Sequence, residues 1–359
     1  MDLPNLHTSL GAVLAPDQIP LHYGDLGAEY WAALEAAVLM ERSHEGRVEI
    51  TGRDYLALPH RMCTNDLESL TPGMGRPTIF TNPNARIIDR VTVFDRGDQT
   101  ALLLTEPGRG DAVRAYLQRN IFFNDDARLT DLTSVTKQFD LHGPQADAVI
   151  AALDPELAAR TDWFGQPLTI AGANVFVTRN KPISGAHWTL IAAAADAGAV
   201  WSALLEIGKA HGLIPAGSLT YNTLRIRAGR PGLGRELSAD YLPLEIGLWD
   251  EVSFTKGCYT GQEIIARMES RNRLAKTIVT LRLSAVIDIP APLRTPEREV
   301  GTLTSNVEAP DGTIFGIGVI KVAAAQPGAD LVVGDTGISA RITGLAGVQP
   351  AAIQQESDQ

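Results

Sequence analysis

Cysteine is scarce in this chain of 359 residues, which contains only Cys63 and Cys258. Two cysteines so far apart do not predict a disulfide framework, and two thiols cannot supply a four-cysteine zinc or iron–sulfur site. No apolar run reaches the roughly 18 residues that a membrane-spanning helix needs. The first residues, Met1-Asp2-Leu3-Pro4-Asn5, lack the basic and then apolar pattern of a secretory signal. We therefore expect a cytoplasmic protein with no membrane association and no metal site.

Nucleotide-binding signatures are also missing. Gly232-Leu233-Gly234 has neither a third glycine at the right place nor a preceding strand, and the chain contains no P-loop. Its 31 Lys and Arg against 42 Asp and Glu give a net charge of −11, so direct nucleic-acid binding is not expected. The histidines are scattered. His44 and His142 are interpreted as surface or hydrogen-bonding residues, because a metal site needs several converging ligands.

Periodicity predicts helices and strands mixed without a strict βαβ alternation, which is typical of an α+β protein rather than a doubly wound sheet. The predicted helices cover residues 27–42, 54–62, 109–118, 143–153 and 193–211, and the first 25 residues show little periodicity. At this length the chain should form two or three domains. From residue 277 on, short strands separated by Gly, Pro and Asp predict a small antiparallel barrel or sandwich. The polar tail, residues 350–359, is expected to be disordered.

The stretch Lys256-Gly257-Cys258-Tyr259-Thr260-Gly261-Gln262-Glu263 precedes a segment with helical spacing of apolar residues. Thr260 and Glu263 fit a capping box, in which each side chain accepts a hydrogen bond from a free backbone N–H. Cys258 would then lie beside a helix N-terminus with the charge of Lys256 nearby, and both conditions stabilise a thiolate. An alternative that stays open is a small buried cysteine at an ordinary strand-to-helix turn.

Arginines are grouped in two places of this acidic chain. Arg225, Arg227 and Arg230 fall within six residues, and a second group of three follows the cysteine, namely Arg267, Arg271 and Arg273. If the groups converge, they would form a pocket for a polyanion such as a carboxylate chain or phosphates. Equally, they could be solvated arginines paired with glutamates of the same region, namely Glu245, Glu251, Glu263 and Glu269.

Residues 256–263 resemble the KGC-aromatic-x-GQE motif of the YgfZ family of folate-binding proteins, relatives of the glycine-cleavage aminomethyltransferase. The similarity extends along most of the chain. The blocks that carry it are His22-Tyr23-Gly24-Asp25, Thr64-Asn65-Asp66-Leu67, Leu141-His142-Gly143-Pro144-Gln145-Ala146, Leu242-Pro243-Leu244-Glu245-Ile246-Gly247-Leu248, Gly301-Thr302-Leu303-Thr304-Ser305 and Gly316-Ile317-Gly318-Val319-Ile320.

This resemblance implies a three-lobed fold of the aminomethyltransferase type, with two interleaved α+β lobes around a central channel and a small C-terminal antiparallel β-barrel. It implies a folate-binding domain over residues 1–276 and a barrel domain over residues 277–349. The implied cofactor is tetrahydrofolate. Family members are associated with the assembly or repair of iron–sulfur clusters, including those of tRNA-modifying enzymes, and Cys258 corresponds to the motif cysteine.

Two departures separate this chain from the aminomethyltransferase pattern. That enzyme resembles this chain around Leu224-Arg225-Ile226-Arg227 but has a glutamate at the position of Arg227. A carboxylate can accept hydrogen bonds from the amino-pyrimidine edge of a pterin, and an arginine cannot. The enzyme also has paired aspartates where this chain has Asp89-Arg90. Both differences argue against aminomethyl transfer, and they leave pterin binding to Asp89 or Glu245.

The leading hypothesis is a folate-binding accessory protein for iron–sulfur proteins or their assembly machinery. Its predicted reactive residues are Cys258, Lys256 and Asp89. The residues predicted to contact folate are Arg225, Arg227, Glu245, Tyr259, Gln262 and Arg267. Two alternatives remain: a tetrahydrofolate-dependent aminomethyl or other one-carbon transferase, and a non-enzymatic scaffold that binds no folate.

Overall fold

The computed structural model describes residues 2–271 and 274–349. The chain forms two compact units that are interleaved along the sequence. Unit 1 comprises Met1–Pro59, Leu67–Pro77 and Val91–Tyr221, and unit 2 comprises His60–Asp66, Thr78–Arg90 and Asn222–Gln359. None of the described helices is long and apolar enough to cross a membrane. The tail predicted to be disordered, residues 350–359, lies outside the described residues.

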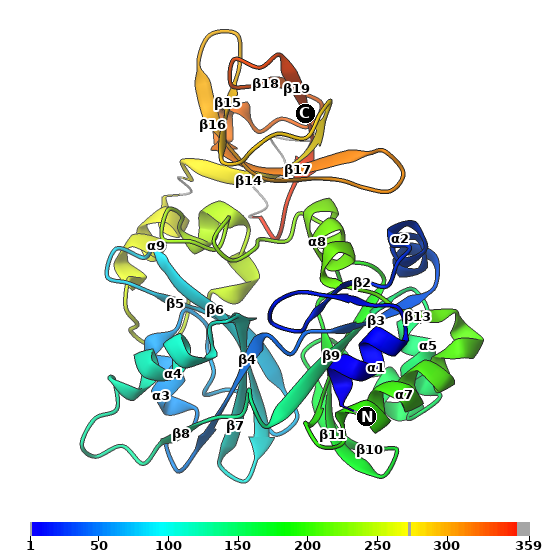
Figure 1. The fold of residues 1–359 in the computed structure, drawn as a ribbon. Helices are drawn as coiled ribbons and strands as arrows, with labels where there is room; N and C mark the ends of the chain where they lie inside the picture. The colour runs from blue at the N-terminus through cyan, green and yellow to red at the C-terminus, as the bar shows by residue number, and fades with distance from the viewer. Residues whose placement is uncertain (1, 272–273, 350–359) are drawn as a thin grey trace. The chain divides into compact units, whose positions relative to one another are not determined.

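The main element of unit 1 is a six-stranded sheet with the order β10-β11-β12-β9-β3-β13 (Figure 1). Its strands pair antiparallel except for β13, which runs parallel to β3. The strands are β3 (Ala37–Glu41), β9 (Thr136–Gly143), β10 (Gly165–Ile170), β11 (Ala173–Asn180), β12 (Ala186–Ala193) and β13 (Leu213–Pro215). The helices of this part are α1 (Leu3–Ser9), α2 (Leu26–Glu35), α5 (Ala146–Ala151), α6 (Pro155–Ala158), α7 (Ala197–Gly208) and the short η1 (Lys209–His211).

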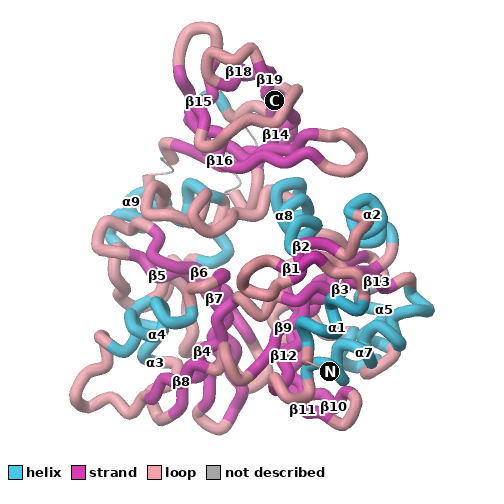
Figure 2. Tube along the Cα trace, viewed as in Figure 1, coloured by secondary structure: helices cyan, strands magenta, loops and turns pink. Residues whose placement is uncertain are grey.

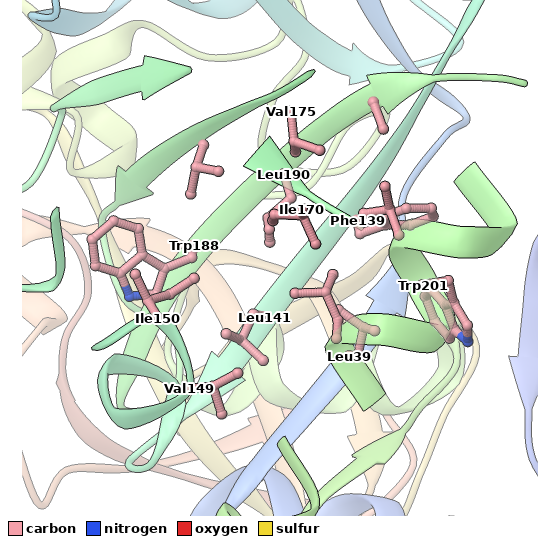
Figure 3. Close-up of a cluster of buried hydrophobic side chains, with 14 of the residues drawn as sticks. Leu39, Phe139, Leu141, Val149, Ile150, Ile170, Val175, Trp188, Leu190 and Trp201 are labelled. Atoms are coloured by element: carbon pink, nitrogen blue, oxygen red, sulfur yellow. The ribbon is translucent and has the colours of Figure 1, made fainter. Parts of the chain in front are cut away.

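One face of this sheet and four helices enclose the core that Figure 3 shows. Alternate residues of two strands point to it, Trp188 and Leu190 of β12 and Phe139 and Leu141 of β9, as a strand buried on one face requires. The helices contribute Leu3 from α1, Val149 and Ile150 from α5, Leu157 from α6, and Val200, Trp201 and Leu204 from α7. The residues that alternate with these core residues on β9 and β12 point to the opposite face of the sheet, where polar side chains can lie.

A five-stranded sheet has the order β5-β6-β7-β4-β8. The strands are β4 (Glu45–Thr51), β5 (Gly75–Thr81), β6 (Ile87–Gly97), β7 (Thr100–Pro107) and β8 (Arg128–Asp131), and the associated helices are α3 (Ala57–Met62) and α4 (Gly110–Gln118). Along the chain, β5 and β6 begin in one unit and end in the other. A two-stranded sheet pairs β1 (Val13–Leu14) with β2 (Pro20–His22).

In unit 2, the last strands close into a six-stranded antiparallel barrel with the order β14-β17-β16-β15-β18-β19 (Figure 2). The strands are β14 (Lys276–Leu283), β15 (Ala291–Arg294), β16 (Glu299–Glu308), β17 (Ile314–Lys321), β18 (Asp330–Val333) and β19 (Ile338–Leu345). Before them come α8 (Ser218–Arg227), η2 (Pro243–Ile246), η3 (Trp249–Glu251) and α9 (Gln262–Ser270), and η4 (Val322–Ala324) follows β17. The α+β class and the C-terminal barrel are confirmed.

Two predicted elements differ from the structure. The helix predicted over residues 27–42 ends at Glu35, and Ala37–Glu41 forms the interior strand β3 instead. The strand pairs with β9 on one side and β13 on the other, and all five of its residues are buried, so both of its faces are covered. A continuous apolar run is compatible with a helix or a fully buried strand, and pairing decides between them. The N-terminal segment, expected to lack periodic structure, contains α1, whose N-cap Asp2 accepts a hydrogen bond from the N–H of Asn5.

Candidate functional site

The candidate site is built around the cysteine loop, residues 256–261, which connects η3 to α9 within unit 2. Cys258 is exposed at its surface, so the alternative of a buried turn cysteine is wrong. The neighbouring Gly257 is open as well, since nothing lies within 4 Å of the position that a Cβ would occupy. By contrast, Tyr259 is buried in a small apolar cluster with Ala85, Leu244 and Ile265. The loop thus buries its tyrosine and presents its thiol to solvent.

Lys256 attaches the start of this loop to the segment His60–Asp66. Its Nζ donates hydrogen bonds to the carbonyl oxygens of His60 at 2.6 Å, Cys63 at 2.9 Å and Asn65 at 2.8 Å. It also lies 5.4 Å from the centre of the Tyr259 ring. An ammonium has three N–H donors, and these three carbonyls match that number. The contacts direct the charge of Lys256 to this backbone segment, whereas the sequence-based prediction assigned it to Cys258.

The second cysteine, Cys63, belongs to that segment and is fully buried. Its thiol donates to the carbonyl of Asn65 at 3.3 Å, and the Nζ of Lys256 lies 4.0 Å from Sγ. Burial raises the pKa of Cys63, although the charge of Lys256 acts in the opposite direction. Cys63 is therefore a neutral, shielded thiol, and Cys258 is the accessible one.

The predicted capping box of Thr260 and Glu263 is wrong. The N-cap of α9 is Gly261, with φ of 86° and no side-chain capping hydrogen bond. A Cβ at Gly261 would lie 2.7 Å from the carbonyl oxygen of Asn82 and 2.8 Å from the Cα of Ala85, so the close approach of this turn requires glycine. The carbonyl of Thr260 accepts a hydrogen bond from Thr81 at 2.5 Å. Because three residues separate Cys258 from the first helical residue, Gln262, the thiol lies outside the first turn, where the helix dipole acts.

Unit 2 also contains a buried ion pair between Arg90 and Glu251. The Nε of Arg90 lies 2.9 and 2.8 Å from the two carboxylate oxygens of Glu251, and one terminal nitrogen lies 2.6 Å from Oε1. Both side chains are less than a tenth exposed. The backbone carbonyl of Glu251 also accepts a hydrogen bond from the Thr64 hydroxyl at 2.7 Å. Arg90, at the position of the second aspartate in the aminomethyltransferase pattern, thus joins the start of β6 to η3. The adjacent Asp89 is buried.

The residues predicted to contact folate each have partners within unit 2. The carboxylate of Glu245 accepts the N–H of Leu242 at 3.0 Å and lies 3.8 Å from Arg86. The guanidinium of Arg225 donates to Asn222 at 2.9 Å and lies 3.7 Å from the buried Glu236. The Nε2 of Gln262 donates to the carbonyl of Gly257 at 3.5 Å.

The other two predicted arginines are exposed. Arg227 lies at the end of α8. The backbone hydrogen bond from Thr313 lowers the pKa of Asp311, with smaller contributions from the Thr313 side chain and from the charges of Arg282 and then Arg227. Arg267 pairs with Glu263 at 3.7 Å across one turn of α9. The Arg225 and Arg267 contacts favour arginines paired with acids over a shared polyanion pocket, and Arg273 lies outside the described residues. The described contacts do not join the predicted folate residues, including Tyr259, into one binding site.

A second polar cluster, in unit 1, was missed from the sequence. Asp140, His142 and His187 are all buried, and one ligand atom from each lies within 4.8 Å of the others. For His142, interpreted from the sequence as a surface or hydrogen-bonding residue, the surface alternative is wrong, because its side chain is fully buried. The available signal was the spacing of Asp140 and His142, which places both on one face of a strand. The position of His187 opposite them depends on strand pairing that the sequence does not show.

Comparison with solved structures defines the class of fold. The crystal structure of the glycine cleavage system aminomethyltransferase T from Bartonella henselae superimposes with a TM-score of 0.83, covering 96% of this chain and 97% of that one at 21% identity. The expected aminomethyltransferase-type fold is therefore confirmed.

Sequence comparison gives the family. Residues 7–256 match the GCVT N-terminal domain, and the chain belongs to this family. It is 34% identical to the Arabidopsis thaliana protein described as "Putative transferase At1g60990, chloroplastic", over 89% of this chain and 74% of that protein. It is also 29% identical to the aminomethyltransferase of Halalkalibacterium halodurans, over 72% of this chain and 71% of that enzyme.

Proposed function

We propose that this protein is a folate-binding accessory protein of the cytoplasm that supports the assembly or repair of iron–sulfur proteins, using the thiol of Cys258. The observation that carries the proposal is the exposure of Cys258 on a loop whose position is fixed by three of its own residues, Lys256, Tyr259 and Gly261. The resemblance of residues 256–263 to the YgfZ motif supplies the iron–sulfur assignment. A role in tRNA modification would be indirect, through client iron–sulfur enzymes that modify tRNA.

The chain itself contributes the position of the thiol. Lys256 holds the loop through three backbone carbonyls, and Tyr259 is buried, so the loop presents Cys258 to solvent while the other cysteine, Cys63, is buried. One thiolate can supply one ligand to iron or attack one sulfur atom. The remaining ligands or the second thiol would come from the client protein or from a small thiol.

Tetrahydrofolate is the cofactor that the family implies. When bound, it carries one-carbon units. The described contacts do not gather the predicted folate residues into one site, so the proposed role of the Cys258 thiol includes no step that involves folate. Its binding is tested separately by calorimetry on the wild type and Arg227→Glu. Affinity in the micromolar range, about −8 kcal/mol, would support folate as a ligand. If neither protein gives binding heat with folate, the alternative of a scaffold that binds no folate is favoured.

Complementation tests the role of the thiol. In a strain that lacks its own family member, wild type should restore the activity of iron–sulfur enzymes, and Cys258→Ser should not. Thr255→Ala, at a neighbouring exposed position of the same segment, is the matched control and should restore activity fully. Equal recovery with Cys258→Ser and wild type would refute the thiol role.

A second candidate is a tetrahydrofolate-dependent one-carbon transferase. It is favoured by the relatives named aminomethyltransferase, which align over more than two thirds of their length, and by the buried carboxylate of Asp89. Incubation of the pure protein with tetrahydrofolate and donors of an aminomethyl group, whose carbon is at the oxidation level of formaldehyde, should then yield methylene-tetrahydrofolate and release the amine as ammonia. Asp89→Asn should abolish the product, whereas Cys258→Ser should leave it unchanged, so the two functions give opposite patterns.

A further inference from the structure

The histidine cluster of unit 1, Asp140, His142 and His187, is formed by two adjacent strands. His142 of β9 lies directly opposite His187 of β12, and Asp140 lies opposite Thr189 in the same register. Because residues two apart share a face, all four side chains lie on one face of this strand pair. Both histidine rings and the carboxylate are less than 5% exposed.

The orientation of His187 leaves one ring nitrogen facing a carboxylate. Its Nδ1 lies 3.2 Å from the carbonyl oxygen of Lys181, which can only accept a hydrogen bond, so Nδ1 carries the proton. Nε2 lies 3.2 Å from Oδ2 of Asp140 but makes no hydrogen bond with a described residue. The distance would allow a hydrogen bond, so it is the direction that prevents one: a proton on Nε2 lies in the ring plane and would not point at Oδ2 of Asp140. A cation between the two atoms but off the line that joins them would satisfy both.

We propose that Asp140, His142 and His187 bind a divalent transition metal such as zinc. A ligand oxygen and nitrogen, each about 2.0–2.2 Å from zinc, lie roughly 3.2–3.5 Å apart at near-tetrahedral angles, close to the distance between Asp140 and His187. At the same near-tetrahedral angle, two imidazoles on one zinc ion place their ring centres roughly 5 Å apart. The rings of His142 and His187 are 4.2 Å apart and must separate by about 1 Å to reach that arrangement. Nε2 of His142 lies 3.9 Å from Oδ2 of Asp140 and must approach by about half an ångström to reach the same ion.

The outer contacts orient these ligands as metal sites usually require. The Thr189 hydroxyl donates to Oδ1 of Asp140 at 2.7 Å, which leaves Oδ2 for the ion, and Asn180 in turn donates to Thr189 at 2.7 Å. The Nδ1–H of His187 is bound by the Lys181 carbonyl. Second partners of this kind fix the tautomer and the ring orientation of ligating histidines.

The charges around the cluster permit a divalent ion. Arg42 is the nearby cation, but Glu45 binds its guanidinium at 2.6 and 2.9 Å, and its face covers the Tyr221 ring at 3.7 Å. The guanidinium of Arg42 is thus bound by Glu45, and the buried carboxylate of Asp140 forms no direct ion pair with a lysine or arginine among the described residues. Two nitrogens and one oxygen favour zinc, cobalt or iron over magnesium or calcium, and a water or small anion would complete the four ligands.

Cobalt(II) titration of the full chain, stripped of metal by a chelator, tests the proposal. Wild type should bind one equivalent with visible d–d absorption and without the near-ultraviolet thiolate band that cysteine ligation gives. His187→Gln and Asp140→Asn should each weaken binding at least about tenfold to a hundredfold, as should the outer-contact variant Thr189→Val. The control His211→Gln, outside the cluster, should bind like wild type.

Zinc should also raise the unfolding temperature of wild type, because a ligand that binds only the folded state stabilises it. His187→Gln, or His142→Gln if the first variant fails to fold, should lose this shift. Absence of cobalt binding by wild type, or equal binding by wild type and the cluster variants, would overturn the proposal. In the first case the cluster is a proton-bound ion pair. Cys258→Ser should bind cobalt like wild type, so failure here is independent of the proposed function.

Discussion

The cysteine loop and the histidine cluster use polar chemistry in opposite ways. In the loop, the reactive thiol of Cys258 is exposed, and the loop is fixed by hydrogen bonds from the Lys256 ammonium to backbone carbonyls. In the cluster, the two imidazoles and the Asp140 carboxylate are themselves buried and contact one another and Thr189. The first arrangement can meet a macromolecule, whereas the second admits only a proton, a water molecule or an ion. Burial therefore decides what kind of partner each site accepts.

The largest difference is expected in thiol reactivity. Cys258 should react with a soluble thiol reagent at the rate of an exposed cysteine, and Cys63 should react only when its surroundings open. Opening of a buried core segment costs several kcal/mol, so the two rates should differ by roughly 10³-fold or more. Mass spectrometry of labelled peptides measures both. Comparable rates would mean that the segment His60–Asp66 is not held as described.

Removal of one partner of the buried ion pair should have the next largest effect. Arg90→Met leaves the Glu251 carboxylate buried and uncompensated, and we expect a loss of about 3–5 kcal/mol in the free energy of unfolding. Denaturant titration measures this loss. Arg96→Met is the matched control, because Arg96 pairs with Glu49 at 3.3 Å in a more exposed place and should cost less than about 1 kcal/mol. Similar costs for both variants would contradict the importance of burial at Arg90.

Loss of Lys256 should loosen the loop rather than unfold the protein. Lys256→Met removes hydrogen bonds to three carbonyls, and a hydrogen bond to a charged group contributes about 1.5–3 kcal/mol net. Because Lys256 is only half-buried, water replaces part of these three contributions in the variant. We expect a net loss of about 2–3 kcal/mol and faster amide hydrogen exchange in residues 60–66 and 256–261. Lys276→Met, at an exposed residue of β14, serves as the control. Unchanged exchange in both segments would show that Lys256 does not hold them.

The smallest expected effect is a pH dependence from the histidine cluster. The pKa of Asp140 is lower in the folded protein than in the unfolded chain, so its charge stabilises the fold above the unfolded pKa. That contribution is lost as the pH falls through the lower, folded value. Measured without metal, the stability difference between wild type and Asp140→Asn should be constant near neutral pH and shrink only in strongly acidic solution. A difference that grows on acidification would have the wrong sign.

The sequence predicts the parts of this protein that depend on local pattern. The helix over residues 109–118 corresponds to α4, because Val113 and Leu117 repeat at helical spacing. The barrel strands follow from short alternating runs between turn residues. The exposure of Cys258 fits a glycine-flanked loop, and the family motif directs attention to it.

Contacts between distant segments are what the sequence does not show. The carbonyls bound by Lys256 belong to residues nearly two hundred positions earlier, and carbonyls have no sequence signature. The same holds for His187 opposite His142, which requires the register of β9 and β12. The capping-box prediction is wrong because Gly261, not Thr260, takes the N-cap position, in a turn that lies too close to Asn82 and Ala85 for any other residue.

The interleaving of the two units has a consequence for how this gene can change. The chain passes between the units after residues 59, 66, 77, 90 and 221, so neither unit corresponds to one uninterrupted stretch of coding sequence. Recombination could not exchange one unit as a single cassette, and a protease that cuts once could not release either of them intact. The barrel strands, from Lys276 to Leu345, are continuous in sequence. Insertions, fusions and exchanges of whole modules should therefore be tolerated at the border of the barrel before they are tolerated elsewhere.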